Sequence, residues 1–260
     1  MAFPAYRRSH RSTNGRAIVL FASDPIASLI AALGGNSIVL GAYAANKGVT
    51  LVSGAVSQWD DARGPVGFGP SLAQATTTKR PLLTGGAIVF DGVDDNLMSA
   101  DVSLFDLSTD KSVFAIGAVT GGTTATIASL SNAAGDRNLG LNTNSTASGF
   151  APAYRDSVAT NTMTITGLAL GTTPRLIAAG KTTTSCIADI PNKAEVTRTP
   201  TGLCASEAAH LAVGDWRQSS PGNPCAWSAQ VVLVLAAKYT ATQLAAVMNF
   251  ATAQAGVVAA

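Results

Sequence analysis

The chain has 260 residues, enough for one large domain or two small ones, and 47% of them are hydrophobic. Only 12% are charged, about half the usual share of a soluble domain, so small neutral side chains must form much of the surface. The net charge of +2 does not favour a nucleic-acid partner, and no apolar run approaches the roughly 18 residues that a membrane-spanning helix needs.

The chain begins with a basic arm, MAFPAYRRSHRSTNGR, and no acidic residue precedes Asp24. The apolar run at 17–22 is too short for a signal peptide, so we expect a protein that folds in the cytoplasm of its host. A terminal segment without apolar periodicity is not expected to be ordered by itself. We therefore expect its arginines to bind an acidic groove on a partner protein; nucleic acid is the weaker alternative, because a few cations give only salt-sensitive attraction. These residues are Arg7, Arg8, Arg11 and Arg16.

Residues 24–34 are predicted to form a short helix. Asp24 suits the N-cap, Pro25 suits the first helical position, and two glycines follow at 34–35. Apolar residues recur with the helical period on one face. We expect residues 1–36 to form an anchoring segment and residues 37–260 to form the domain that follows it.

The middle of the chain is predicted to be β-rich. Short runs of β-branched and apolar residues, from SIVLGAY at 37–43 to SAQVVLVLA at 228–236, alternate with turns that contain Gly, Asn, Pro or Asp. Many short strands at this spacing predict an all-β fold, an antiparallel sandwich or barrel. Gly121–Gly122 and Asn192–Lys193 are expected at hairpin tips. Residues 60–86 are expected to be a long loop that is either functional or held in place by another part of the protein.

The chain is predicted to end in a second helix. Thr240 and Gln243 have the spacing of a capping box. The apolar residues that follow lie on one helical face; they are Leu244, Val247, Met248 and Ala251.

Three cysteines, an odd number without CxxC spacing, do not make a disulfide framework, and with two histidines they make a poor zinc set. Cys204 and Cys225 could pair across a loop, but reduced thiols, including Cys186, are expected in a protein that folds in a cytoplasm.

The stretch VFDGVDDNL contains three aspartates directly after a predicted strand. Asp91, Asp94 and Asp95 could bind calcium, act in acid–base chemistry or shape a turn. Calcium prefers such oxygen ligands, but the alternating D-x-D-x-D-G spacing that wraps an ion is absent.

The order of these segments resembles the concanavalin A-like (LamG-type) jelly-roll family, above all members found in tailed-phage virion proteins. The segments that match are VSQWDDARG (56–64), AIVFDGVDDNL (87–97), AAHLAVGDW (208–216) and the strand with its following helix at 228–257. The resemblance implies an antiparallel β-sandwich with a short N-terminal and a C-terminal helix. It also implies that Trp59 is buried and that Gly92 forms a tight turn, in which the aspartates accept hydrogen bonds from backbone N–H groups. Calcium binding by these aspartates is the alternative to a purely structural turn, and no other cofactor is expected.

Glycoside hydrolases that use this jelly roll need two carboxylates facing one groove. The chain has only two glutamates, Glu195 and Glu207, and neither lies in an ExDxxE pattern. Asp60 and Asp61 are adjacent, so they face opposite sides of any strand. Neither a GxSxG elbow nor a nucleotide motif is present. The sequence therefore predicts that the protein is not an enzyme.

Two functions remain. The first is a structural role in a phage virion, as a capsid decoration, head-fibre or tail component that binds other virion proteins and copies of itself. The alternative is a carbohydrate-binding, lectin-like module, because sugar sites combine exposed aromatic rings with polar side chains. Its candidate residues are Trp216, Tyr154, Arg155 and Asp156.

Overall fold

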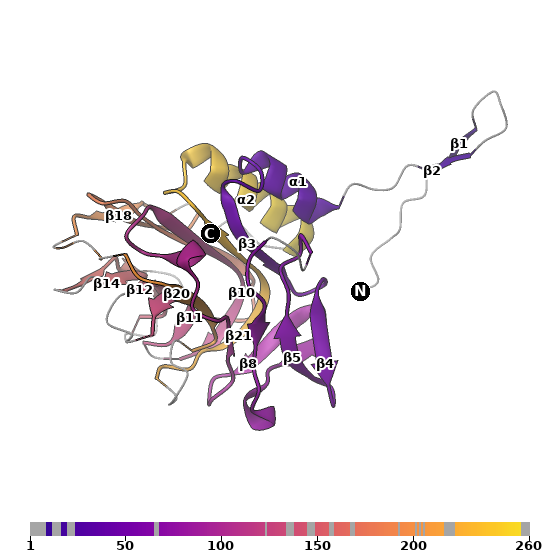
Figure 1. The fold of residues 1–260 in the computed structure, drawn as a ribbon, viewed down its shortest axis with the longest axis horizontal. Coiled ribbons are helices and arrows are strands. Elements are labelled where there is room, and N and C mark those ends of the chain that lie inside the picture. The colour runs from indigo at the N-terminus through magenta and orange to yellow at the C-terminus, as the bar shows by residue number, and fades with distance from the viewer. Residues whose placement is uncertain are drawn as a thin grey trace.

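Two layers of antiparallel strands lie face to face, and two helices cover the outer side of one layer (Figure 1). This architecture confirms the predicted all-β, antiparallel β-sandwich with a short N-terminal helix and a C-terminal helix. The computed structural model describes residues 9–11, 17–19, 24–64, 68–122, 124–133, 138–144, 149–155, 159–166, 170–191, 193–200, 202, 204, 206–215 and 222–255.

The helix-covered layer is built around two long central strands, which pair with each other in antiparallel register. Its strands in spatial order are β19 (Val196–Arg198), β18 (Cys186–Asp189), β17 (Arg175–Lys181), β10 (Lys111–Gly121) and β21 (Ala226–Leu235). One half of β21 then pairs with β3 (Val39–Ala44) and the other half with β8 (Ala87–Asp91), which continues to β7 (Leu82–Thr84), β5 (Ala55–Trp59) and β4 (Val49–Val52). Strand β10 is apolar on both faces because the second layer covers one face and the helices the other.

The second layer has no helix on its outer face among the described residues (Figure 1). Its strands in spatial order are β6 (Leu72–Ala73), β9 (Leu97–Met98), β20 (Ala209–Val213), β11 (Thr126–Asn132), β12 (Asn138–Asn142), β14 (Ala153–Arg155) and β15 (Thr160–Thr162). The two layers are joined because β5 pairs with β7 at its start and with β6 at its end. Short elements at the rim are β13 (Gly149–Phe150), β16 (Ile165–Thr166) and the 3₁₀ turns Thr77–Lys79 and Ser103–Phe105.

The main hydrophobic core lies between the two layers. Trp59 is buried in it, as the resemblance implied, and so is Trp227. Phe90 stacks on Trp227 with ring centroids 5.7 Å apart. The indole nitrogen of Trp59 donates a hydrogen bond of 3.0 Å to the Ala44 carbonyl. The tryptophans thereby contribute a large buried apolar area, which is the main favourable term in folding.

The helices begin where the sequence predicts. Asp24 caps α1 (Pro25–Ala32) by accepting a hydrogen bond from the Ile26 N–H at 3.0 Å. The capping box of α2 (Ala241–Ala255) is reciprocal: the Thr240 N–H donates to Gln243 Oε1 at 2.9 Å, and the Gln243 N–H donates to Thr240 Oγ1 at 3.2 Å. Both helices pack their apolar faces on β3, β10, β17 and β21. No described helix is both long and apolar enough to cross a membrane.

A buried ion pair holds the segment that follows β5. Arg63 Nε and Nη2 donate to the two carboxylate oxygens of Asp61 at 2.9 and 2.6 Å. The same guanidinium donates to the carbonyls of Val39 and Leu40 in β3, and Asp61 accepts from the Gly69 N–H at 3.0 Å. The start of the predicted 60–86 loop is therefore fastened to the neighbouring strand, and β6 and β7 lie further along it.

A small hairpin precedes α1. Strands β1 (Ser9–Arg11) and β2 (Ala17–Val19) pair in antiparallel register, where the sequence predicted no regular structure. The hairpin lies away from the sandwich (Figure 1). Arg7, Arg8 and Arg16 lie outside the described residues, and Arg11 is described only as part of β1. The anchoring role of residues 1–36 stays a prediction; since α1 packs on the sandwich, that role would fall to residues before Pro25.

Candidate functional site

A polar groove lies on the outer face of the second layer. Side chains alternate along its strands, so that Leu130 and Leu139 enter the core while Ser129 and Asn138 face outward. The outward positions of β11, β12, β14 and β15 are mostly Ser, Thr, Asn or a small residue. This face therefore presents hydroxyl and amide groups without a covering helix.

Small residues form the floor of the groove. Ser129 in β11 lies opposite Gly140 in β12, which in turn lies opposite Ala153 in β14. Directly opposite residues of an antiparallel pair share a face, so these three positions make one low row across three strands. A larger side chain in this row would fill the groove.

Polar side chains form the walls around this floor, and the hollow has a volume of about 150 Å³. Thr126 Oγ1 donates a hydrogen bond of 3.0 Å to Asn142 Oδ1 on the neighbouring strand. The only charged side chain among the described lining residues is Arg155. The lining residues not yet named as part of the floor are Thr124, Thr126, Asn138, Asn142, Arg155, Thr160 and Asn223.

Ser129 is the unusual member of this set. Its side chain is only 2% exposed, and within the described structure its Oγ atom is buried without a hydrogen-bond partner. Burying an unpaired hydroxyl costs about 1–3 kcal/mol. Because the Oγ atom is itself buried, a ligand hydroxyl in the groove would bond it only after neighbouring lining side chains moved aside, and would then recover part of that cost.

A buried carboxylate fixes one end of the groove. Asp215 follows β20 and accepts hydrogen bonds from the backbone N–H groups of Gly222 and Asn223 at 2.8 and 3.1 Å. The Asn223 carbonyl accepts from the Thr126 N–H at 2.8 Å. Asn223 is thus held against β11, where it lines the groove.

The predicted carbohydrate-binding residues divide into three groups. Arg155 lines the groove. Tyr154 does not, and the expectation of an exposed ring there is wrong: it alternates with Arg155, so its ring is buried between the layers, where its hydroxyl lies 3.1 Å from Cys204 Sγ. Trp216 and Asp156 lie outside the described residues; in the sequence they directly follow Asp215 and Arg155.

The other groove residues were not predicted from the sequence. The signal that could have found them is the alternation of leucine with polar or glycine residues in SLS (129–131) and NLGLN (138–142), which marks the solvent face of a strand. Their convergence depends on strand pairing that the local sequence does not specify.

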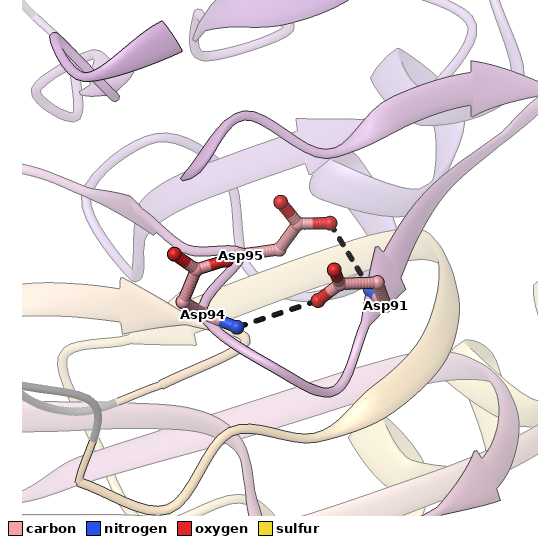
Figure 2. A group of neighbouring side chains, drawn as sticks. All are labelled: Asp91, Asp94 and Asp95. Carbon is pink, nitrogen blue, oxygen red and sulfur yellow. Dashed lines mark hydrogen bonds between the residues drawn. The ribbon is translucent and has the colours of Figure 1, made fainter. Parts of the chain in front are cut away.

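The three aspartates at 91–95 form a tight turn after β8 (Figure 2). Asp91 Oδ1 accepts from the Val93 and Asp94 N–H groups at 2.8 and 3.4 Å, and Asp95 Oδ2 accepts from the Asp91 N–H at 3.0 Å. Gly92 between them has φ +77°, which favours glycine. The turn expected from the resemblance is present, with Phe90 buried in the core.

One carboxylate oxygen from each aspartate lies within 4.8 Å of the others. Burial is the main reason that the pKa of Asp95 is raised to about 6, and the neighbouring Asp91 and Asp94 charges add to the shift. Calcium binding at this turn stays a prediction, because the hydrogen bonds within the turn already account for the arrangement.

A larger hollow of about 380 Å³ lies between α1 and the segment that holds Arg63 and Phe68. Its charged groups are paired with one another or with nearby groups: Lys47 Nζ lies 2.5 Å from Asp24 Oδ2, and Arg63 bonds Asp61 and stacks over the Phe68 ring at 4.7 Å. The groove on the second layer is therefore the better candidate site.

All three cysteines are buried, and none of them is in a disulfide bond. The possible pairing of Cys204 with Cys225 is absent, in agreement with the expectation of reduced thiols. Burial raises the pKa of the Cys225 thiol to about 12, so this group is a weak nucleophile.

Comparisons with known proteins show the fold but no close relative. No family model matches the sequence, and no curated protein matches it. Among solved structures, the sialidase of Trypanosoma rangeli is similar over 83% of this chain, with a TM-score of 0.60 and 11% identity. The same enzyme in complex with sialic acid gives a TM-score of 0.60 and 12% identity. The CBM40 of the Ruminococcus gnavus IT-sialidase, bound to α2,3-sialyllactose, matches 62% of this chain and 95% of its own length, with a TM-score of 0.50 and 15% identity.

These comparisons identify the chain as a β-sandwich of the kind found in sialidases and carbohydrate-binding modules. The chain covers only 33% of the length of the sialidase chains that it matches. They also correct one conclusion of the sequence analysis. The exclusion of an enzyme does not stand, because chains with this fold include sialidases; a missing ExDxxE pattern therefore does not separate binding modules from enzymes of this fold.

Proposed function

We propose that the protein is a glycan-binding module and that the groove on the outer face of β11, β12, β14 and β15 is its binding surface. The observation that carries this proposal is the buried, unpartnered hydroxyl of Ser129 at the floor of a groove walled by hydroxyl and amide groups. Such a lining is matched to sugar hydroxyls, which both donate and accept hydrogen bonds. The fold shared with a CBM40 bound to sialyllactose supports the same function.

The arrangement of the layers supports this choice of face. The outer face of the other layer is covered by α1 and α2 over most of its central strands. The second layer keeps its outer face free of helices within the described chain, and small floor residues leave room for a sugar ring. The same surface therefore offers both room for a sugar ring and side chains that can form hydrogen bonds with it.

The comparisons favour this function over the virion role predicted from the sequence. The similar structures described above are sialidases and a carbohydrate-binding module, which are proteins that act on or bind sugars. The contacts with capsid or tail proteins that the sequence predicted thus lack support, whereas the glycan partner predicted as the alternative is the one we propose.

The experiment compares two serine-to-alanine variants on a glycan array and in isothermal titration. Ser129→Ala should weaken glycan binding roughly five- to tenfold, as expected for one hydrogen bond, while leaving thermal stability unchanged or slightly raised. Ser112→Ala is the matched control: this buried hydroxyl donates to the Ala237 carbonyl at 2.7 Å and accepts from the Tyr239 N–H at 2.9 Å. The Ser112→Ala variant should be less stable than the wild type and should bind glycans with unchanged affinity.

A third variant tests the shape of the site. Ala153→Leu places a larger side chain in the floor row and should abolish binding of every glycan that the wild-type protein recognises. Retained affinity in Ala153→Leu would move the site elsewhere. An array without any bound glycan for the wild-type protein would overturn the proposal.

A further inference from the structure

Strand β4 is an edge of the helix-covered layer. Among the described residues it pairs with β5 alone, and in Figure 1 it lies at the margin of the sheet, beside β5. Edge strands are usually protected from intermolecular pairing by charges or prolines. The sequence from residue 48 to residue 59, GVTLVSGAVSQW, contains neither.

The outer edge of β4 is regular. The ladder between β4 and β5 shifts register after Thr50, which lies opposite Gln58, while Leu51 lies opposite Val56. The extra residue, Ser57, therefore belongs to β5. Its hydroxyl donates to the Thr50 carbonyl at 3.2 Å, and the irregularity does not disturb the backbone of β4 that faces away from β5.

An apolar stripe runs to this edge across four strands. Val52, Ala55, Leu82 and Val89 lie opposite one another in successive pairs of β4, β5, β7 and β8, so their side chains share the outer face. Val52 and Leu82 are 45% and 53% exposed. Neither helix packs on this stripe, since both cover the other half of the layer.

The opposite face of β4 is apolar too. Leu51 lies on the same side as the core residue Val56 but is 46% exposed. Strand β4 thus exposes a large apolar side chain on each face, together with the free side of its backbone.

We propose that β4 pairs in antiparallel register with β4 of a second copy of this chain. An exposed strand edge is satisfied by another extended strand, and an uncharged strand with apolar residues on both faces is complementary to itself under a two-fold axis. The pairing joins the helix-covered layers of two copies into one sheet and buries Leu51 and Val52 of each copy. The groove on the second layer stays free, so this inference does not depend on the proposed function.

The test is sedimentation velocity over a concentration series of the full chain. The wild-type protein should show a monomer–dimer equilibrium, and the double variant Leu51→Lys/Val52→Lys should weaken the dimer at least about tenfold, because it places like charges opposite each other. Val93→Lys is the matched control, since Val93 is 67% exposed in the turn after β8. It should dimerise like the wild type.

A wild-type protein that stays monomeric at every concentration would overturn the proposal, as would a double variant that dimerises with unchanged affinity. Amide hydrogen exchange of the wild-type protein supplies a second measurement that needs no variant. Protection of residues 49–52 should rise with protein concentration, and protection independent of concentration would also overturn the proposal.

Discussion

Replacing Arg63 with methionine should destabilise the protein far more than the loss of an ordinary ion pair. The side chains of Arg63 and Asp61 are both buried, and the guanidinium is bound to both carboxylate oxygens and to two carbonyls of β3. Methionine keeps much of the apolar volume but leaves the Asp61 carboxylate without its counter-charge.

Breaking a buried pair from one side costs about 3–5 kcal/mol. Asp61 still accepts hydrogen bonds from the backbone N–H groups of Arg63, Gly69 and Ala42, so the lower end of this range applies. For a domain of this size, 1 kcal/mol shifts the melting temperature by about 2–4 °C. We therefore expect a decrease of roughly 6–12 °C.

The assay is urea unfolding together with calorimetry, and the exposed pair formed by Lys47 and Asp24 supplies the control. Lys47→Met should cost less than about 1 kcal/mol, as exposed pairs do. Adding Asp61→Asn to Arg63→Met should restore part of the loss, because it removes the uncompensated charge. If Arg63→Met cost no more than Lys47→Met, the buried pair would not be what holds the 61–69 segment against β3.

Three further predictions concern the turn after β8. Asp95→Asn should stabilise the protein above pH 6 by up to about 3 kcal/mol, with no difference near pH 4. The pKa of Asp95 in the folded state, about 6, is above its ordinary value of 3.8. The stability of the wild type therefore falls as pH rises from about 4 to 6, whereas asparagine stays neutral. Thermal melts from pH 4 to 8 measure the difference in stability between the two proteins, and a difference that does not change with pH would contradict the prediction. The same melts with and without calcium test the ion, whose stabilising effect should be lost in Asp95→Asn. Gly92→Ala should lower stability by about 1–3 kcal/mol, because φ is +77° and the new Cβ atom would lie 2.8 Å from the Ala226 backbone nitrogen; an unchanged urea midpoint would show that the turn can adapt.

The class of fold was predictable because its signals repeat along the chain. Alternation in a dozen short segments indicated strands, and the turns between them indicated an antiparallel sandwich. Strand partners were less predictable. Gly121–Gly122, expected at a hairpin tip, instead leads from β10 in one layer to β11 in the other: β10 pairs with β17 and β21, and β11 pairs with β12 and β20. Glycines signal a change of direction but not the layer to which the chain goes next.

The candidate site shows the same division. Arg155 was identified only as a polar neighbour of Tyr154, and Tyr154 was assigned to the surface although its ring is buried. The two-residue period of a strand indicates that neighbouring side chains face opposite sides of the sheet, but it does not indicate which side faces the core. Ser129 was not identified at all, because its place in the groove follows from the pairing of β11 with β12 and of β12 with β14, which the local sequence does not specify.

The sequence by itself determined the local features: the capped ends of both helices, the turn at Gly92, and the apolar alternation of the strands. Each of these depends on contacts between residues a few positions apart, so a short stretch of sequence is sufficient to specify it. Only the tertiary structure decided which face of each layer is covered, which polar side chains converge on the groove, and which strand remains an open edge. These depend on pairing and burial between segments far apart in the chain, where the free energy belongs to the assembled sheet and to no single segment.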